Sequence, residues 1–494
     1  MGHWSVVFVK IKKDSFIRIF DNTGYIVNKT TFSDRITDES GAIFLSTLSR
    51  DAKAIDEIAG DIIRSFIDAD LAEIKQDCID FFGELERDGF IVSGETLSEL
   101  EKKDSEFLDN SFFDILKNKS LSLSQTEIDT KTYLDNYFQN SPRLMSLHIE
   151  LTTRCNEQCI HCYLPHKART KDIEASFFYS VLEQCHRMGV LDITLSGGEP
   201  LLHPNFCDFL QKAKEHDFSI AVSSNLTMLN ENILLKMKDV SLSSVHVSLY
   251  SMKAEIHDSI TQLSGSFEKT KCGILKLIEN NIPVQINCPV MKQNKNCYKD
   301  VLRWGHENKC RVLTDFIMMA KYDHTTDNIL NRLSPEETEE VMLNIINNDV
   351  VYQQKFIDTN FENKYASNKD ISNDIVCGVC KTSLCMAVNG NMYPCPGWQD
   401  YVCGNVKEST LKNIWRNSAQ IKYLQSLRRK DFPKCLKCED REFCALCIAR
   451  NANEDSKGNI FKINNHVCKV AAINRKIAIE WRTKHLQKFD YKNT

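Results

Sequence analysis

The sequence predicts an α/β protein whose centre is a parallel, barrel-like sheet. From about residue 145 to residue 319, short apolar segments alternate with longer amphipathic ones, a pattern typical of repeated strand–helix units. Many of the 20 cysteines gather at two places, directly after the first of these strands and in the last quarter of the chain. A chain of 494 residues is too long for one hydrophobic core, so about three domains are expected.

Residues 1–92 are expected to form a separate N-terminal domain. Short strands are predicted at Ser5–Lys10, Phe16–Phe20 and Tyr25–Asn28, and Asp21–Gly24 has the composition of a hairpin turn. Three helical patterns follow these strands, at 41–49, 51–67 and 70–88.

Residues 141–325 are expected to form the barrel from six strand–helix units. The strands are predicted at Ser146–Leu151, Leu191–Leu195, Ser219–Ser223, Ser244–Leu249, Pro283–Pro289 and Leu313–Met318. Helices such as Glu174–Met188 and Phe267–Asn280 lie between them. Because active sites of parallel barrels lie at the C-terminal strand ends, functional residues are expected in the loops there. A linker, 93–140, precedes the barrel, and a connecting segment, 326–370, follows it.

Three cysteines come directly after the first predicted strand: Cys155, Cys159 and Cys162, with the spacing C-x3-C-x2-C. Three thiolates on one loop can hold three irons of a [4Fe–4S] cluster and leave the fourth iron open to another ligand. On spacing alone, a zinc site or a chance grouping of cysteines is about as well supported as the iron–sulfur cluster. The second predicted strand, however, runs into Ser196-Gly-Gly-Glu-Pro200, whose glycines allow the backbone to approach a ligand closely. An ordinary strand–helix turn is the alternative for that segment.

The cysteine spacing together with Gly197-Gly-Glu-Pro200 resembles the radical S-adenosylmethionine (SAM) superfamily. The resemblance implies a partial (β/α)6 barrel and a [4Fe–4S] cluster whose open iron is chelated by the amino and carboxylate groups of SAM. Electron transfer into the sulfonium would then release a 5′-deoxyadenosyl radical. The resemblance also implies SAM contacts from the strand ends: Gly197, Gly198, Glu199, Ser224, Asn225 and Ser248. A capping or turn role is the alternative for the last three, and Tyr250 is expected either to face the substrate or to pack.

Composition changes sharply after about Ile371, where cysteines become frequent. Half of the 20 cysteines lie beyond this point: Cys377, Cys380, Cys385, Cys395, Cys403, Cys435, Cys438, Cys444, Cys447 and Cys468. The sequence shows no signal peptide and no apolar run long enough to span a membrane. We therefore expect metal-bound thiolates in a reduced cytoplasm rather than disulfide bonds.

The spacing Cys380-x9-Gly390-x4-Cys395, followed by a run C-x2-C-x5-C-x2-C, resembles the SPASM domain, to which residues 371–470 are assigned. The resemblance implies two auxiliary [4Fe–4S] clusters. The distal cluster would be held by Cys435, Cys438, Cys444 and Cys468. The proximal cluster would draw its ligands from Cys395, Cys447, Cys377, Cys380 and Cys385, which is one candidate too many. The last x2 of the run, where x3 is usual, is the one departure from the pattern.

A zinc ribbon is the competing interpretation, with the pairs Cys377/Cys380 and Cys435/Cys438 as ligands. It would leave the other cysteines of the region without a role. Cys403 is interpreted as a packing residue, and so are the isolated cysteines, because free cysteine packs as a small hydrophobe: Cys78, Cys185, Cys207, Cys272, Cys288, Cys297 and Cys310. The remaining residues, 471–494, are expected to be a C-terminal helix or tail.

The order of a β-hairpin followed by helices in residues 1–92 resembles PqqD-like peptide-recognition domains. Such domains bind the leader segment of a ribosomally made precursor as an added strand at an exposed sheet edge. A winged helix for nucleic acid is one alternative, but a net charge of −5 and many acidic residues between 34 and 88 argue against phosphate binding. A structural cap is a second alternative.

These features predict a radical SAM enzyme that modifies a ribosomally synthesised peptide, by forming a thioether or another cross-link. Its partners would be the precursor peptide and an electron donor such as flavodoxin or ferredoxin, with no nucleic acid and no membrane. Four alternatives remain: protein oxidation of the anaerobic sulfatase-maturing type, peptide epimerisation, a small-molecule reaction, and a non-catalytic peptide-binding protein with structural clusters. The sequence names no general acid, general base or hydrogen donor.

Overall fold

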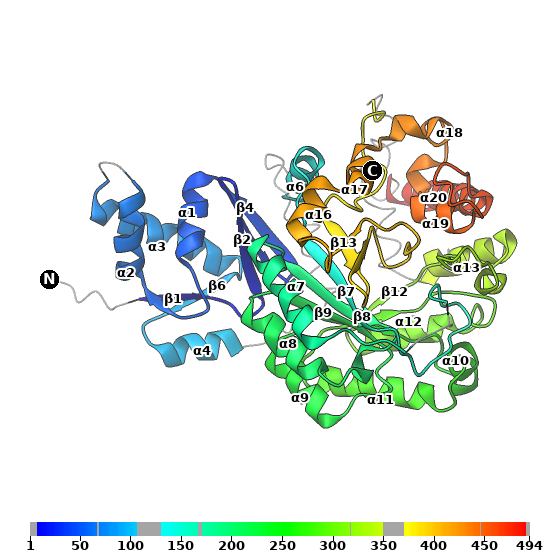
Figure 1. The fold of residues 1–494 in the computed structure, drawn as a ribbon, viewed down its shortest axis with the longest axis horizontal. Helices are drawn as coiled ribbons and strands as arrows, with labels where there is room; N and C mark the ends of the chain where they lie inside the picture. Colours follow the sequence, from blue (N-terminus) through cyan, green and yellow to red (C-terminus); the bar gives the residue numbers. More distant parts are fainter. Residues whose placement is uncertain are drawn as a thin grey trace.

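The structure, a computed structural model, describes residues 7–66, 69–105, 130–165, 170–316, 318–348, 370–444 and 446–490. Figure 1 shows the N-terminal domain at one end of the molecule, beside the barrel, and the C-terminal region packed against the barrel farther along. The predicted α/β fold is confirmed. No helix in the described part of the chain is long and apolar enough to cross a membrane.

The barrel consists of parallel strands in the order β12-β11-β10-β9-β8-β7. Their bounds are β7 Ser146–Thr152, β8 Asp192–Gly197, β9 Ser219–Ser224, β10 Ser244–Ser248, β11 Val284–Asn287 and β12 Arg311–Leu313. The helices between and after them are α7 Ala175–Arg187, α8 Phe206–Glu215, α9 Glu231–Asp239, α10 Ala254–Thr261, α11 Ser266–Glu279 and α12 Tyr298–Glu307, with η2 Pro200–Leu202 after β8.

The strand predicted at Leu313–Met318 is misplaced, because β12 ends at Leu313. Met318 is buried, but it packs with Tyr250, Ile260 and Met291. Its apolar character thus serves the packing of a loop against α10 and the segment after β10, not a strand.

The sheet continues past the barrel into the C-terminal region. Strand β13 (Ser383–Met386) pairs in parallel with β7, and β14 (Asn391–Tyr393) and β15 (Gly404–Asn405) follow antiparallel, giving one nine-stranded sheet. Gly390 lies in the predicted hairpin turn with a φ of 88°, a left-handed value that favours glycine. The cysteine-rich region is therefore fixed to the first barrel strand by main-chain hydrogen bonds.

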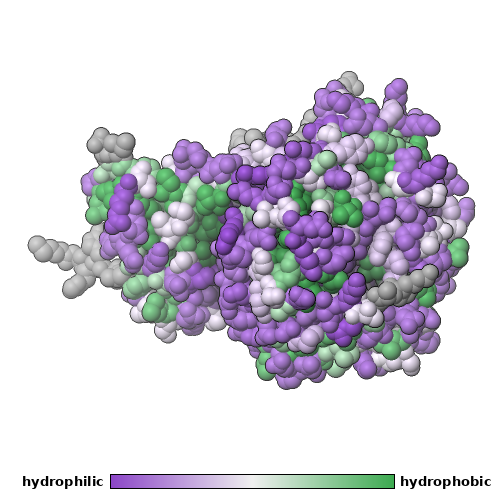
Figure 2. All heavy atoms as spheres, viewed as in Figure 1, coloured by the Kyte–Doolittle hydropathy of each residue, from purple (hydrophilic) through white to green (hydrophobic). Residues whose placement is uncertain are grey.

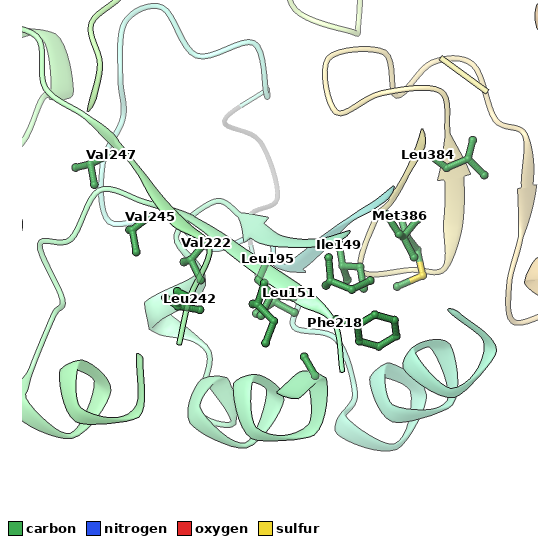
Figure 3. Packing of buried hydrophobic residues seen from close by; sticks show 14 of the residues in the cluster. Ile149, Leu151, Leu195, Phe218, Val222, Leu242, Val245, Val247, Leu384 and Met386 are labelled. Carbon is green, nitrogen blue, oxygen red and sulfur yellow. The ribbon is translucent and has the colours of Figure 1, made fainter. Parts of the chain in front are cut away.

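Side chains alternate between two environments along the barrel strands. Leu147, Ile149 and Leu151 of β7 are fully buried in the main core. Figure 3 shows such residues of β7, β8, β9 and β10 between the sheet and its helices. Because alternate residues point to the opposite face, His148 and Glu150 face the inside of the barrel.

The N-terminal domain contains two small antiparallel sheets covered by helices. One sheet has the order β5-β1-β6 and the other the order β2-β3-β4. The elements are β1 Phe8–Ile11, β2 Ser15–Phe20, β3 Thr23–Asn28, β4 Ser33–Thr37, α1 Glu39–Thr47, β5 Lys53–Ala54, α2 Ile55–Ile62, η1 Ile63–Ser65, α3 Leu71–Arg87, β6 Ile91–Gly94 and α4 Leu97–Ser105. The three predicted helices are present within a few residues, whereas β4 was not predicted.

The sheet β2-β3-β4 docks on the end of the barrel where the strands begin. Phe16, Phe20 and Tyr25 pack with Met145 and Leu191, which precede β7 and β8. Ion pairs support the contact: Lys29–Asp192 at 2.8 Å, Arg50–Asp217 at 2.9 Å and Arg18–Asp217 at 3.5 Å. Helix α6 (Thr130–Asn140) packs on the same face of the sheet through Phe138.

The C-terminal region contains short helices and one long one. They are η3 Asn328–Asn331, α13 Pro335–Asn348, α16 Leu411–Asn417, α17 Ala419–Ser426, η4 Arg429–Asp431, α18 Pro433–Leu436, η5 Arg441–Phe443, α19 Ile448–Asn453 and α20 Asn465–Asp490. Helices α13 and α20 pack together through Met342, Ile346, Ile477 and Trp481.

Candidate cluster and cofactor site

The loop that carries Cys155, Cys159 and Cys162 begins where β7 ends, as predicted. All three side chains are partly buried. Burial raises the pKa of the Cys159 thiol well above its usual range, and Glu157, Cys162 and Cys155 raise it further. Since such electrostatic effects require proximity, the structure brings the three thiols together.

Two buried polar atoms of this loop, Glu157 Oε1 and His161 Nδ1, have no hydrogen-bond partner among the described residues. Buried polar atoms are nearly always paired, so unpaired ones beside three thiols point to a group that binds there. The loop therefore fits an iron–sulfur cluster with a further ligand at its open iron.

The zinc alternative fits less well. Within the part of the chain that the structure describes, no three Cys, His, Asp or Glu side chains are grouped so that they could hold one metal ion. Thiolates around a single zinc each lie about 2.3 Å from it. Thiolates of a cluster bind different irons and stand farther apart. The described cysteines therefore offer no site for a single zinc ion, whereas the ligands of a cluster need not stand so close together.

The turn Gly197–Gly198 lies against the backbone of the cysteine loop. Gly197 has a φ of 137°, and a Cβ there would lie 2.2 Å from the carbonyl oxygen of Thr152. A Cβ on Gly198 would lie 2.2 Å from the carbonyl oxygen of Arg154. The backbone N–H groups of Gly198 and Glu199 donate to these same two carbonyls, each at 2.8 Å. Both glycines are therefore needed to seat this turn beside the cysteines.

Glu199 is only 1% exposed and organises the neighbouring strand ends. Its Oε1 accepts hydrogen bonds from Leu201 N at 3.0 Å and Ser224 Oγ at 2.7 Å, and its Oε2 accepts one from Asn225 N at 2.7 Å. Burial raises the pKa of Glu199 to about 7, although these donors act in the opposite direction. With its oxygens so occupied, Glu199 holds the ends of β8 and β9 together.

Asn225 connects the end of β9 to the cysteine loop. Its Nδ2 donates to Asn156 Oδ1 at 3.0 Å, and Asn156 Nδ2 donates to Thr227 Oγ1 at 2.6 Å. Thr227 in turn donates to Asn225 Oδ1 at 2.7 Å. This closed network fixes the loop between the first two cysteines relative to β9.

Ser248 and Tyr250 bring the end of β10 to the same place. The Tyr250 hydroxyl lies within hydrogen-bonding reach of Ser248 and Cys159. Its ring meets the His161 ring edge-on, with centroids 5.0 Å apart. Burial lowers the pKa of His161 to about 4, so this imidazole is neutral at pH 7. The structure thus places Tyr250 against the cysteine loop, and His161 is a neighbour that sequence reasoning did not single out.

The four cysteines predicted for the distal cluster lie together. Burial raises the pKa of Cys444 to about 11, with further contributions from Cys468, Cys435 and Cys438. The pKa of Cys468 is raised by burial and then by Cys435 and Cys438. Because each thiol influences the pKa of the others, these residues of α18, of the segment after it and of α20 lie close together.

The proximal group is also assembled, with one unexpected member. Burial raises the pKa of Cys395 to about 12, and Cys447 and Cys377 contribute. The pKa of Cys380 is raised first by a hydrogen bond with Cys403. Cys403 was interpreted as a packing residue; it is buried, but its thiol lies against a predicted ligand.

Cys385 lies on β13, where burial and the charges of Glu150 and Cys395 raise the pKa of its thiol. Three residues around it were missed by sequence reasoning. Gln399 Nε2 donates to Glu150 Oε1 at 2.5 Å, inside the barrel. Burial raises the pKa of Glu150 to about 7. Burial also raises the pKa of Tyr163, and the charges of Glu150, Cys162, Cys385 and Cys395 add to it. Tyr163 therefore lies between the first cysteine loop and the C-terminal cysteines. Nothing in a single sequence indicates contacts between segments so far apart.

Comparison with known families agrees with this geometry. Residues 149–305 match the radical SAM superfamily, and residues 377–439 match the SPASM iron–sulfur cluster-binding domain. The radical SAM domain binds a [4Fe–4S] cluster and SAM, and the SPASM domain binds auxiliary iron–sulfur clusters. The predicted cofactors are thereby confirmed, whereas the assignment of individual ligands stays a prediction.

The curated relatives act in more than one pathway. An AdoMet-dependent heme synthase of Methanosarcina barkeri is 26% identical over 63% of this chain and 92% of its own length. AlbA, the antilisterial bacteriocin subtilosin biosynthesis protein of Bacillus subtilis, is 26% identical over 64% of this chain and 70% of its own length.

Solved structures share the fold. SuiB of Streptococcus suis, in complex with its precursor peptide SuiA, aligns with a TM-score of 0.59 at 16% identity, over 93% of this chain and 99% of SuiB. The AdoMet-bound structure of anSMEcpe aligns with a TM-score of 0.54 at 18% identity, over 71% of this chain and 96% of its own.

Proposed function

We propose that this radical SAM enzyme, which carries a SPASM domain, modifies a ribosomally synthesised peptide whose leader binds to the PqqD-like N-terminal domain. The observation that carries the proposal is an open strand edge beside a groove in that domain. Strand β4 pairs with β3, and no strand of the described residues pairs with its other edge. An extended peptide can add to such an edge through main-chain hydrogen bonds.

The groove lies between β4, the start of α1 and α3, and its volume is about 480 Å³. Phe44 and Phe81 line it with their ring centroids 5.5 Å apart, which offers a place for an apolar side chain. Asp77 and Asp80 of α3 also line it and are exposed. Figure 2 shows hydrophobic atoms on the surface of the N-terminal domain. The leader is therefore expected to present an apolar residue and a basic residue to this groove.

Two of the comparisons support a peptide substrate. SuiB is known in complex with a precursor peptide, and AlbA serves bacteriocin biosynthesis. Other relatives are named heme synthase and GTP cyclase, so the barrel alone does not distinguish peptides from small molecules. The groove and the open edge of β4 favour the peptide.

We assign the reacting groups to the C-terminal end of the barrel. Cys155, Cys159 and Cys162 would hold the catalytic cluster, and the Gly197–Gly198 backbone, with Asn225 and Ser248, would hold SAM. When bound, SAM and this cluster supply a 5′-deoxyadenosyl radical that takes a hydrogen atom from a substrate carbon. The chain's own contribution is to fix the position of that carbon and to exclude water. Thioether formation would remove two hydrogens from the peptide. One would leave the carbon as a hydrogen atom, and the other would leave the thiol as a proton, with the remaining electron taken up by an auxiliary cluster.

We assign the auxiliary clusters to two groups of cysteines. Cys435, Cys438, Cys444 and Cys468 would hold the distal cluster. The mutual effects among the remaining cysteines favour Cys377, Cys380, Cys395 and Cys447 for the proximal one. Cys385, on β13 beside Glu150, is also influenced by Cys395 and is a fifth candidate ligand. An electron donor such as flavodoxin or ferredoxin would reduce the catalytic cluster.

The test is anaerobic turnover with SAM, a reductant and short peptides encoded beside the gene, followed by tandem mass spectrometry. A peptide about two mass units lighter, with the change placed at a cysteine and a second residue, is expected for a thioether. In D2O, a gain of about one mass unit would indicate epimerisation instead. Formation of 5′-deoxyadenosine while every such peptide stays unchanged would contradict the proposed substrate.

A further inference from the structure

Glu150 is a buried carboxylate inside the barrel that none of the proposed cluster or SAM contacts uses. It lies on β7, and its side chain points away from the core face that carries Ile149 and Leu151 (Figure 3). It is only 6% exposed. Because removing a carboxylate from water is costly, a buried one is normally paired with a cation or with several hydrogen-bond donors.

No cation of the described residues acts on the Glu150 carboxyl group. Its hydrogen-bond donor is an amide, Gln399 Nε2, at 2.5 Å from Oε1. His148, two residues earlier on the same strand, is neutral at pH 7, because burial lowers its pKa to about 4. The other titratable groups that face Glu150 come from the cysteine loop, β13 and β14, and none is a base: Tyr163, Cys385 and Tyr393. A carboxylate kept buried without a counter-ion is typical of a functional site.

The strand register places Glu150 beside the turn that we assign to SAM. Glu150 is the partner of Ser196 in the parallel pairing of β7 with β8, and Ser196 directly precedes Gly197 and Gly198. Paired strands lie about 4.8 Å apart, and paired residues point to the same face of the sheet. The carboxyl group therefore lies next to the place where, under the proposed function, the substrate carbon is held.

Glu150 also lies close to both groups of cluster cysteines. Its partner Gln399 comes shortly after Cys395, a proposed ligand of the proximal cluster. Tyr163 directly follows Cys162, a proposed ligand of the catalytic cluster. Burial raises the pKa of Tyr163, with further contributions from Glu150, Cys162 and Cys395, so these groups are near one another. Glu150 is thus situated between the catalytic and the proximal cluster sites.

We propose that Glu150 is the proton acceptor of the reaction and takes the thiol proton of the substrate cysteine during thioether formation. The proposal rests on the proposed function and adds the residue that receives the proton. One C–H bond and the S–H bond of the substrate break, and the C–S bond forms. The hydrogen atom goes to the 5′-deoxyadenosyl radical, the proton goes to Glu150, and the one remaining electron goes to an oxidised auxiliary iron–sulfur cluster. Gln399 holds the carboxyl group through Oε1, which leaves Oε2 for the thiol.

The experiment compares Glu150→Gln with wild type, both as full-length holoenzyme, on the precursor that wild-type enzyme converts to a thioether in the assay above. The amide has nearly the size of the carboxylate but does not take up a proton. Glu215→Gln is the matched control, because Glu215 also accepts a hydrogen bond from a glutamine, Gln211 Nε2 at 3.3 Å, but lies exposed on α8. Iron content and precursor binding, the latter by fluorescence anisotropy, are measured for each variant.

Thioether formation by Glu150→Gln is expected to fall about a hundredfold or more at neutral pH, since a positioned proton acceptor contributes a factor of that order. Iron content, precursor binding and the rate of 5′-deoxyadenosine formation should stay close to wild type, so the yield of 5′-deoxyadenosine per thioether rises. The loss should shrink when the pH is raised above about 8.5, because the substrate thiol then ionises without an acceptor. A merely structural role of Glu150 would give no such relief.

An unchanged yield of 5′-deoxyadenosine per thioether in Glu150→Gln would overturn the proposal, and so would a loss of equal size at neutral and high pH. Should this variant fail to take up iron, Glu150→Asp decides, because it keeps a carboxylate but withdraws it by one methylene group. Its smaller loss should be relieved at high pH, and a loss without relief would overturn the proposal. Failure of the proposed function looks different: wild type itself would leave every precursor unchanged, and the role of Glu150 would be refuted with it.

Discussion

The two ends of the barrel carry different kinds of site. At the C-terminal end, function depends on a few side chains at fixed places, such as the three thiols and the buried carboxylate of Glu199. At the N-terminal end, a groove and a cavity are lined by many residues of mixed character. The difference teaches that chemistry is concentrated in single groups, whereas peptide recognition is spread over surface. Substitutions should therefore abolish function at the first end and weaken binding at the second.

The largest effect is expected when the three thiols are removed together. The variant Cys155→Ala/Cys159→Ala/Cys162→Ala should form no 5′-deoxyadenosine, because nothing would hold the catalytic cluster. Chromatography of anaerobic reactions measures this product. A fluorescent leader peptide should bind the variant as it binds wild type, since the groove lies at the other end of the barrel. Residual SAM cleavage would show that the cluster is held elsewhere.

A smaller effect at the same end is expected for Glu199→Gln. The amide would place an N–H group where one or two donors now point, leaving buried groups unpaired at a cost of about 1 to 3 kcal/mol. We expect a lower free energy of unfolding in urea and weaker SAM binding to the reconstituted enzyme. Glu215→Gln, at the end of α8, is the matched control. Equal behaviour of the two variants would mean that Glu199 does not order the site.

At the other end, reversing charge in the groove should weaken leader binding by about tenfold to a hundredfold. The variant is Asp77→Lys/Asp80→Lys on α3, and the readout is fluorescence anisotropy of a labelled leader at low and high salt. The loss should shrink at high salt, because exposed charges are screened. Glu57→Lys/Asp61→Lys on α2 changes the net charge equally outside the groove. If both variants lost the same affinity, the groove would not be the leader site.

The smallest effect concerns pH. His257 is 1% exposed, and burial lowers its pKa to about 4. Between pH 6.5 and about 4 the unfolded chain takes up a proton that folded His257 does not, so the free energy of unfolding falls as pH falls, by at most about 1.4 kcal/mol per pH unit. Replacing the ring, in His257→Asn, should reduce this slope. Urea unfolding at several pH values checks it, and an unchanged slope would contradict the assignment.

The sequence alone predicted those features whose defining residues all lie in one short segment. The cysteine loop, the Gly197–Gly198 turn and the hairpin at Gly390 are local, and each depends on residue types that few other side chains can replace. The barrel strands are recognisable because short apolar strands alternate regularly with longer amphipathic helices along this part of the chain. Strand β4 was missed because Ser33, Asp34 and Arg35 are polar. These side chains face α3 and solvent as much as they face a hydrophobic core, so the strand lacks an apolar pattern.

What the sequence did not show depends on contacts between distant segments. Glu150 and Gln399 are 249 positions apart, and a single sequence does not show which strand residue faces the barrel interior. The contact of Cys403 with Cys380 joins β14–β15 to a loop before β13. The cavity at the strand starts is lined by many separate strand ends and is covered by Lys29, Thr30 and Phe32 of the N-terminal domain. Such features follow from topology, not from composition.

The most direct test of the whole account compares full-length precursor with the same peptide lacking its leader. Both are offered anaerobically to wild-type enzyme, and kcat/KM for the modified product is measured by mass spectrometry alongside 5′-deoxyadenosine. Because a bound leader raises the effective concentration of the core segment to roughly millimolar, we predict that the leaderless peptide is modified at least about a hundredfold less efficiently. Uncoupled 5′-deoxyadenosine should still form with either peptide. Equal efficiency for the two peptides would contradict the claim that leader binding at one end of the barrel serves chemistry at the other.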